Sequence, residues 1–163
     1  MKVKKIIVLI MAICLANGMS AQNSTDFNIT TIRQQAEEGN AEAQNKLAEC
    51  YYTGENVIQD YKEAAKWWGK AAEQGHAKSQ YNLGVCYYES EGVSQDYGEA
   101  VKWFRKAAEQ GHAHAQYNLG VCYAKGEGVT RNKEEAFKWF SKAAEQGHAT
   151  AQKALKKLVL RGF

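Results

Sequence analysis

Three cysteines and three histidines recur along the chain at a constant spacing of 36 residues. The cysteines are Cys50, Cys86 and Cys122, and the histidines are His76, His112 and His148. Thiols can form disulfides or act as nucleophiles, and imidazoles can bind a metal ion or transfer protons. Each of these reactions needs two or more side chains close together. Whether it can occur therefore depends on how the helices or strands that carry these residues are arranged.

The constant spacing comes from an internal repeat. Three units, residues 36–71, 72–107 and 108–143, align without a gap, and a partial fourth unit covers residues 144–163. A fixed period of this length is typical of a solenoid, in which each unit buries its apolar face only against its neighbours. We therefore expect a stack of similar units.

Each unit contains two helical patterns. Around Leu47 in the first half and Trp68 in the second half, apolar and small residues recur at intervals of three and four, the period of an amphipathic helix. In the first unit we expect these helices at residues 41–53 and 60–73. The chain contains no proline, and the predicted fold is all-α, a solenoid of stacked antiparallel helix pairs.

The residues between the helical patterns agree with this reading. Glycines that can end a helix follow each pattern of the second kind, at Gly39, Gly75, Gly111 and Gly147. Residues suited to cap the second helix of a unit stand at Asp60, Asp96 and Asn132.

The two ends of the array are predicted to be caps. Residues 22–35 should form an N-terminal tail and capping helix, in a helical pattern that runs over Asn28–Glu38. At the other end, Ala149–Leu160 matches a first helix alone. Lys156 stands there in place of a small residue, which suits a helix that no partner follows.

Several runs of residues recur nearly unchanged. They are Ala-Glu-Gln-Gly-His-Ala at 72–77 and 108–113, Gln-Tyr-Asn-Leu-Gly-Val-Cys-Tyr at 80–87 and 116–123, and Ala-x-x-Trp-Phe-x-Lys-Ala-Ala at 100–108 and 136–144. Over residues 36–155 the chain resembles Sel1-like repeats, relatives of tetratricopeptide repeats with a longer loop between the helices. The resemblance implies a right-handed α-solenoid that serves as an adaptor or scaffold for other proteins. The first unit departs from the pattern, with Asn45 and Ala48 where the others have Tyr and Gly.

The stack separates the recurring cysteines and histidines from one another. Equivalent points of successive units lie about 10–20 Å apart, from interhelical distances of about 8–10 Å, whereas a disulfide needs Cα atoms within about 7 Å. We expect small buried thiols, with a reactive thiol or a linked dimer as the alternative. The same spacing spreads His76, His112 and His148 along one edge, near helix starts where the first unit has Asn40. No metal site and no cofactor are predicted.

The strongest candidate for a functional site is an extended binding surface, not a cluster of catalytic or metal-binding side chains. In tetratricopeptide repeats the concave face is built mainly by the first helices, and the resemblance carries that face onto residues that flank Leu47, Leu83 and Leu119. Its predicted partner-binding residues are Asn45, Glu49, Tyr52, Lys78, Tyr81, Val85, Tyr88, His114, Tyr117 and Val121. Tyrosines beside valines are typical of protein interfaces. Tyr81 and Tyr117 could also be partly structural.

These features predict a non-catalytic module that binds a peptide or partner protein on its concave face. Two alternatives are an exported hydrolase acting on peptidoglycan-like or β-lactam substrates and a structural spacer without a ligand. No Ser-x-x-Lys or Gly-x-Ser-x-Gly element supports the hydrolase. Beyond residue 21 the chain has 18 Lys and Arg against 18 Asp and Glu, so a nucleic-acid partner is not expected. Self-association through the open ends is possible.

Residues 1–21 have the order of a secretory signal peptide. Three lysines lie within the first five residues, an apolar run covers residues 6–16, and a small and polar stretch ends at Ala21. The apolar run is shorter than the roughly 20 residues of a membrane span. The protein is therefore expected to be exported, periplasmic or secreted, without stable membrane insertion after cleavage. Acylation at Cys14 is the alternative.

N-terminal sequencing of the protein from the producing cell tests this expectation. Cleavage after Ala21 leaves Gln22 as the first residue, since small residues precede signal-peptidase sites. An acylated N-terminus at Cys14 would support the lipoprotein alternative, and an intact Met1 would contradict both.

Overall fold

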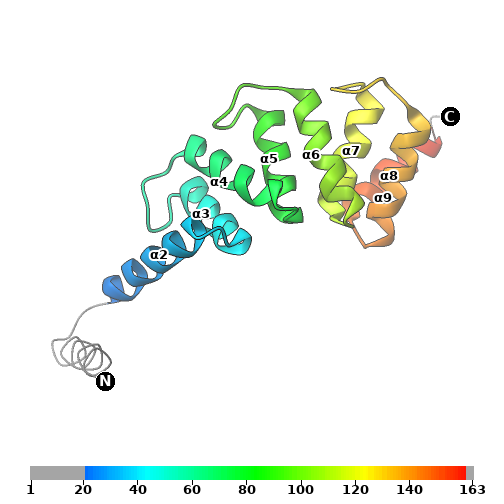
Figure 1. Ribbon diagram of the computed structural model, residues 1–163. Coiled ribbons are helices and arrows are strands. Elements are labelled where there is room, and N and C mark those ends of the chain that lie inside the picture. The colour runs from blue at the N-terminus through cyan, green and yellow to red at the C-terminus, as the bar shows by residue number, and fades with distance from the viewer. Residues whose placement is uncertain (1–20, 161–163) are drawn as a thin grey trace, which may run out of the picture.

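The computed structural model describes residues 21–160, which form eight helices and no strand. The helices are α2 (Ala21–Glu37), α3 (Ala41–Thr53), α4 (Tyr61–Glu73), α5 (Ala77–Glu89), α6 (Tyr97–Glu109), α7 (Ala113–Lys125), α8 (Lys133–Glu145) and α9 (Ala149–Leu160). Figure 1 shows them following one another along an elongated array, with α2 at one end and α9 at the other. Within this range, no helix combines the length and hydropathy of a membrane span. Apart from Ala21, the predicted signal peptide lies outside the described residues.

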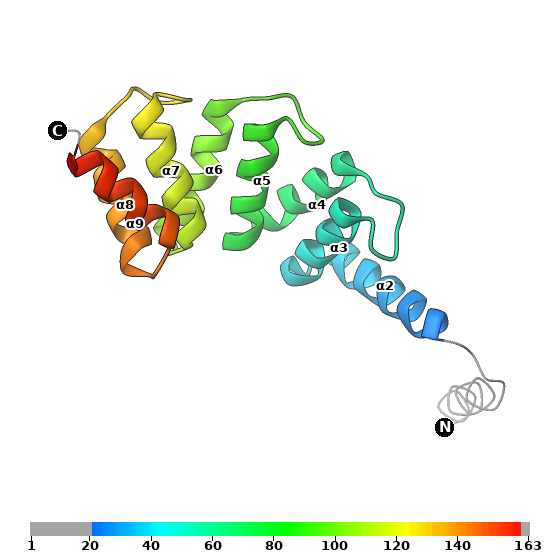
Figure 2. The ribbon, with the colours of Figure 1, turned by 180° about the vertical axis from the view of Figure 1, so that it is seen from behind.

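The helices pack mainly against their neighbours in sequence. The closest associations are the pairs α3–α4, α5–α6 and α7–α8, and each pair packs on the next through α4–α5 and α6–α7. The view from behind shows the same succession (Figure 2). The predicted all-α solenoid of stacked antiparallel helix pairs is confirmed.

Helix limits follow the expected signals closely. In the first unit α3 covers the predicted residues 41–53, and α4 starts at Tyr61 after its cap, Asp60. The Asp60 carboxylate accepts hydrogen bonds from the backbone N–H groups of Lys62 and Glu63. The N-terminal helix is the exception, because α2 begins at Ala21 rather than at Asn28. No glycine or proline interrupts the chain there, so nothing ends the helix between those positions.

The core of each pair is an aromatic ring pressed against a residue with little or no side chain. A Cβ atom placed on Gly84 would come within 2.6 Å of the Phe104 ring, and one on Gly120 within 2.7 Å of the Phe140 ring. In the first unit, buried Ala48 takes the place of these glycines. The small residue therefore lets the two helices of a pair approach closely.

Tryptophans join successive units. Trp103 of the second unit belongs to a buried cluster with Trp67 and Leu83, and Trp139 of the third unit packs with Phe104 and Leu119. Lysines one turn later cover the outer faces of these rings: Lys106 lies 4.2 Å from the ring centre of Trp103. The aromatic side chains are therefore core, at the surfaces where units meet.

Glutamines tie each unit to the helix before it. The Gln80 side chain donates to the carbonyl oxygen of Ala72 at 3.0 Å, and its own amide oxygen accepts from Gln110 at 2.7 Å. Gln116 makes the same pair of contacts with Ala108 and Gln146. Because Gln80 and Gln116 are 4% exposed, these bonds satisfy backbone and side-chain groups that water does not reach.

The glycine contact can be tested by one substitution in two settings. Gly84→Ala should lower the free energy of unfolding by about 1–2 kcal/mol, since overpacking costs about 1–3 kcal/mol and helix propensity returns at most about 1 kcal/mol. Gly69→Ala is the control, because Gly69 lies in α4 with open space around its missing Cβ. It should raise stability by about 0.5–1 kcal/mol. Urea denaturation measures both, and equal effects would contradict the close-contact explanation.

Candidate functional site

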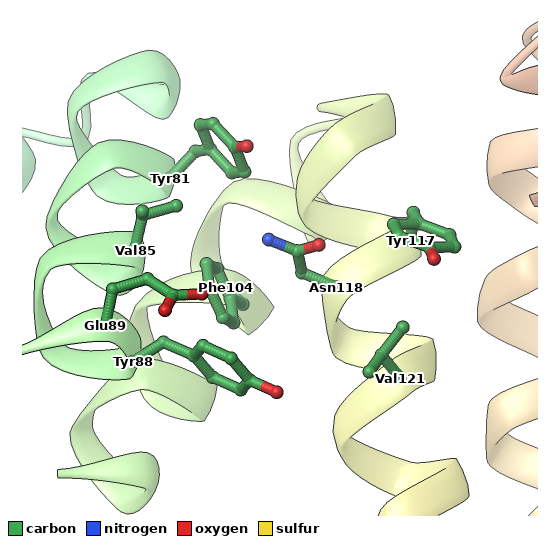
Figure 3. Close-up of a pocket in the computed structure, with 8 residues that line it drawn as sticks. All are labelled: Tyr81, Val85, Tyr88, Glu89, Phe104, Tyr117, Asn118 and Val121. Carbon is green, nitrogen blue, oxygen red and sulfur yellow. The ribbon is translucent and has the colours of Figure 1, made fainter. Parts of the chain in front are cut away.

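The face built by the first helices is hollowed between α5 and α7. We call this the second hollow, because another precedes it along the chain. It has a volume of about 270 Å³ and is lined by Tyr81, Val85, Tyr88, Glu89, Phe104, Tyr117, Asn118 and Val121. In Figure 3, Val85 and Tyr88 extend from α5, Phe104 of α6 forms the back, and Asn118 points from α7 toward Phe104. Five of the ten predicted partner-binding residues lie here, and most of the lining is aromatic or aliphatic.

A first hollow lies between α3 and α5. It has a volume of about 310 Å³ and is lined by Glu49, Tyr52, Trp68, Lys78, Tyr81, Asn82, Val85, Cys86 and Glu91. Tyr81 and Val85 also line the second hollow, so the two are continuous across α5. Lys78 forms an ion pair with Glu49 at 2.6 Å.

A third hollow lies between α7 and α9. It has a volume of about 320 Å³ and is lined by Ala124, Arg131, Lys133, Phe140, Ala154, Lys157 and Leu158. None of these residues is among the predicted partner-binding residues. The hollow occupies the same place in the last unit as the other two do in theirs.

The three hollows are one structural feature repeated every 36 residues. The ring at the back is Trp68, Phe104 or Phe140, and the position beside it is Asn82, Asn118 or Ala154. The position one turn further along the first helix is Val85, Val121 or Lys157. We call the row of three hollows the junction groove. The rings behind the second and third hollows, Phe104 and Phe140, are the ones that pack on Gly84 and Gly120.

Two groove tyrosines anchor the loop of the following unit. The Tyr52 hydroxyl donates to the Glu91 carboxylate at 3.0 Å, and the Tyr88 hydroxyl donates to Glu127. Burial, together with the bond to Glu91, raises the pKa of Tyr52 to about 12. Each ring is half-buried, so one edge remains open to a ligand while the hydroxyl holds the loop.

The other two groove tyrosines stack on histidines. The Tyr81 ring lies 4.7 Å from the His112 ring, and the Tyr117 ring lies 4.9 Å from the His148 ring, both nearly parallel. Each stack joins a first helix to the start of the next first helix. Tyr81 and Tyr117 therefore have a structural part, in addition to the surface that they present to the groove.

The histidines are helix N-caps. Nδ1 of His76, His112 and His148 accepts the backbone N–H of Ser79, Ala115 and Ala151, each at 3.2 Å. In the first unit the Asn40 side chain does the same for Ala43 at 2.9 Å. A capping Nδ1 must be unprotonated, so a neutral ring carries its proton on Nε2.

His148 also contacts a fourth histidine. Its Nε2 lies 3.0 Å from Nδ1 of His114, and the capping bond makes His148 the donor. The spacing of equivalent histidines did not reveal this pair, because His114 lies 34 residues before His148 rather than 36. A protonated Nε2 cannot bind a metal ion. Among residues 21–160, no group of three or more His, Cys, Asp and Glu side chains is placed to hold one.

The cysteines of the repeat are free thiols. Cys86 and Cys122 are buried, and Cys50 is partly buried. Burial raises the pKa of both Cys86 and Cys122 to about 12. Since the thiolate is the nucleophile, these two side chains are unreactive at neutral pH. The expectation of small buried thiols is confirmed for Cys86 and Cys122.

Two of the predicted partner-binding residues lie outside the groove. Asn45 is 2% exposed and accepts from the Ser79 hydroxyl at 3.0 Å, so its assignment to the binding surface was wrong. Asparagine is smaller than the tyrosines at the equivalent positions, and it is drawn inward to a hydroxyl that the later units lack. His114 lines a separate hollow with His148, outside the junction groove.

Sequence reasoning also missed groove residues. Asn82 and Asn118 follow the groove tyrosines directly, and the repeated Tyr-Asn-Leu run was the available signal. Lys157 could have been found by its spacing of 36 residues from Val121. Arg131 comes from the loop between α7 and α8, and Lys133 is the first residue of α8. No periodicity predicts that these two residues lie beside α9.

The fold and groove define an α-helical repeat protein of the solenoid class. The family model described as Sel1 repeat matches residues 41–76, 77–112 and 113–148. The chain belongs to the Sel1 repeat family, whose fold is commonly that of protein-interaction modules. The matched units begin at the first helix of each pair, five residues after the limits expected from the sequence, with the same period.

Solved structures agree with this assignment. A Sel1 repeat protein from Oxalobacter formigenes has 42% identity and a TM-score of 0.70, over 72% of this chain and 49% of that chain. A protective antigen of uropathogenic Escherichia coli strains with an SLR fold has 37% identity and a TM-score of 0.67, over 83% and 37%. This chain thus spans half or less of the length of either relative.

A more distant structure shares the fold alone. Helicobacter pylori cysteine rich protein B has 22% identity and a TM-score of 0.64, over 85% of this chain and 100% of that chain. Comparison with curated protein sequences finds no significant match.

The histidine caps predict a loss of stability in acid. Burial lowers the pKa of His112 and His148 below the ordinary value of 6.5, and nearby His114 lowers both further. The unfolded chain therefore binds these protons first, and the free energy of unfolding falls as the pH drops below 6.5. A lost cap costs about 0.5–2 kcal/mol.

The variant His112→Asn/His148→Asn separates this effect from carboxylate titration, because asparagine already caps α3 without titrating. Melting temperatures at pH 7.5 and pH 5.0, chosen to lie roughly one unit or more either side of the usual histidine pKa, should fall less for the variant than for the wild type. Equal falls in both proteins would show that the caps do not sense pH.

Proposed function

We propose that this protein is a non-catalytic interaction module that binds a peptide or an extended segment of a partner protein along the junction groove. The observation that carries the proposal is the row of three equivalent hollows, each backed by an aromatic ring. A peptide crossing them would meet the same kind of pocket at each unit. Repetition of this sort suits an extended ligand better than a compact one.

The groove offers both parts of a peptide site. Half-buried Tyr81, Val85 and Val121 supply apolar surface, and apolar surface with aromatic rings is what interface anchors bury. Asn82 and Asn118 supply amide groups that can donate to and accept from a peptide backbone. Their spacing of one repeat would place one such group in each of two successive hollows.

The compartment is part of the proposal. A chain that begins with lysines, an apolar run and a small and polar stretch would act outside the cytoplasm. An exported module would meet its partner in the cell envelope or beyond it. The partner is therefore best sought in those fractions.

Affinity capture from the native envelope fraction tests the proposal. Tyr81→Ala/Tyr117→Ala removes two groove rings, and a specific partner retained by the wild type should be lost. A second variant, Val121→Lys, fills the second hollow without removing a stacked ring. The third hollow already holds Lys157 at this position, which indicates that the fold tolerates the change.

Because Tyr81 and Tyr117 also stack on His112 and His148, each variant is compared at a temperature where its melting curve shows that it is folded. The control is Glu73→Ala/Glu109→Ala, two exposed positions at the ends of α4 and α6, which should bind as the wild type does. Equal retention by the groove variants would place the binding surface elsewhere. Absence of any specific partner would contradict the proposal.

A further inference from the structure

We infer that the junction groove changes from acidic at its first hollow to basic at its third. It therefore selects a segment with a basic side chain at one end, an apolar side chain in the middle and an acidic side chain at the other end. This inference rests on the proposed function, since it names the chemistry of the ligand for the same groove. The inference depends on the differences in charge among the three hollows, whereas the proposed function depends on the features that they share.

The first hollow is acidic. Its lining includes the carboxylates of Glu49 and Glu91 and one cation, Lys78. Lys78 lies 2.6 Å from Glu49 and offsets that charge. Glu91 accepts a hydrogen bond from the neutral hydroxyl of Tyr52, which does not offset its charge. A lysine or arginine side chain entering this hollow would meet a net negative charge and two tyrosine rings, Tyr52 and Tyr81, which also attract cations.

The second hollow is the apolar one. Val85, Phe104 and Val121 line it together with three tyrosines. Its one carboxylate, on Glu89, is exposed at the end of α5. A ligand side chain that fills this hollow is therefore apolar or aromatic.

The third hollow is basic. Arg131, Lys133 and Lys157 line it beside Phe140 and Leu158, and among the described residues its lining includes no carboxylate. Lys157 takes the place that Val85 and Val121 have in the other hollows. An aspartate or glutamate side chain would be attracted here, over an apolar base.

The net charge of the whole array changes from negative to positive in the same direction as the charge of the hollows. Residues 21–76 contain five Lys and Arg against nine Asp and Glu, and residues 113–160 contain eight against four. The net charge thus runs from −4 at the N-terminal end to +4 at the C-terminal end. A field of this kind orients a ligand of opposite polarity as it approaches.

The spacing of the hollows sets the spacing of the charges on the ligand. Equivalent points one helix pair apart lie on the order of 10–20 Å from each other. An extended chain covers about 3.3 Å per residue. The basic and acidic residues of the segment should therefore each lie roughly three to six residues from the central apolar residue.

Selection from a random peptide library displayed on phage tests the inference. The protein is purified from producing cells in the form found there and is immobilised. The library is applied at low ionic strength, and the enriched peptides are sequenced. We expect an apolar or aromatic residue flanked by Lys or Arg on one side and by Asp or Glu on the other. A synthetic copy of the most enriched peptide is then titrated by fluorescence anisotropy.

Matched charge variants locate each end. Arg131→Gln/Lys157→Gln should weaken binding of the selected peptide roughly three- to tenfold, the effect of two partly exposed ion pairs. It should have no effect on a peptide whose acidic residue is replaced by its amide. Glu49→Gln/Glu91→Gln should behave in the same way toward the basic residue, and glutamine can still accept the bond from Tyr52.

The outcomes separate the inference from the proposed function. One outcome is that Val121→Lys weakens binding of the enriched peptides, but the charge variants weaken it equally for peptides with and without the matching charge. This would overturn the inference and leave the groove as the binding site. Binding that survives Val121→Lys would contradict both. If no peptide is enriched, the inference fails, and envelope capture alone decides whether a folded partner uses the groove.

Discussion

The packing of an aromatic ring against a nearly bare stretch of helix underlies the rest of this structure. Phe104 can lie on α5, and Phe140 on α7, only because Gly84 and Gly120 have no Cβ to meet the rings. That contact sets the separation of the two helices in a pair. It also leaves the other face of each ring as the back of a hollow between successive first helices. Stability and the candidate binding surface thus depend on the same side chains.

The repeated framework allows the surface to vary. Buried positions change little between units, because a ring, a small residue and a glutamine must fit the same geometry each time. Groove positions are freer: at one equivalent position the first two hollows have the neutral Val85 and Val121, and the third has the cationic Lys157. A solenoid can therefore keep one fold while its groove changes from acidic to basic along its length.

Residues with catalytic potential are occupied by structural tasks. Nδ1 of His112 and His148 is committed to capping a helix, which fixes the position of the ring proton. The Cys86 and Cys122 thiols are held in their neutral form by burial. Reactive side chains at repeated positions are in this case packing and capping groups, since the repeat places them at helix starts and in cores.

The sequence alone determined the period, the helices and their caps, because these depend on contacts within about four residues of the chain. It also indicated most of the groove, since α5 and α7 carry it at matching positions. The burial of Asn45, the pairing of His114 with His148 and the basic third hollow were decided by the tertiary structure. Each involves elements of different units, and whether they meet depends on how the helix pairs stack, which residue spacing does not specify.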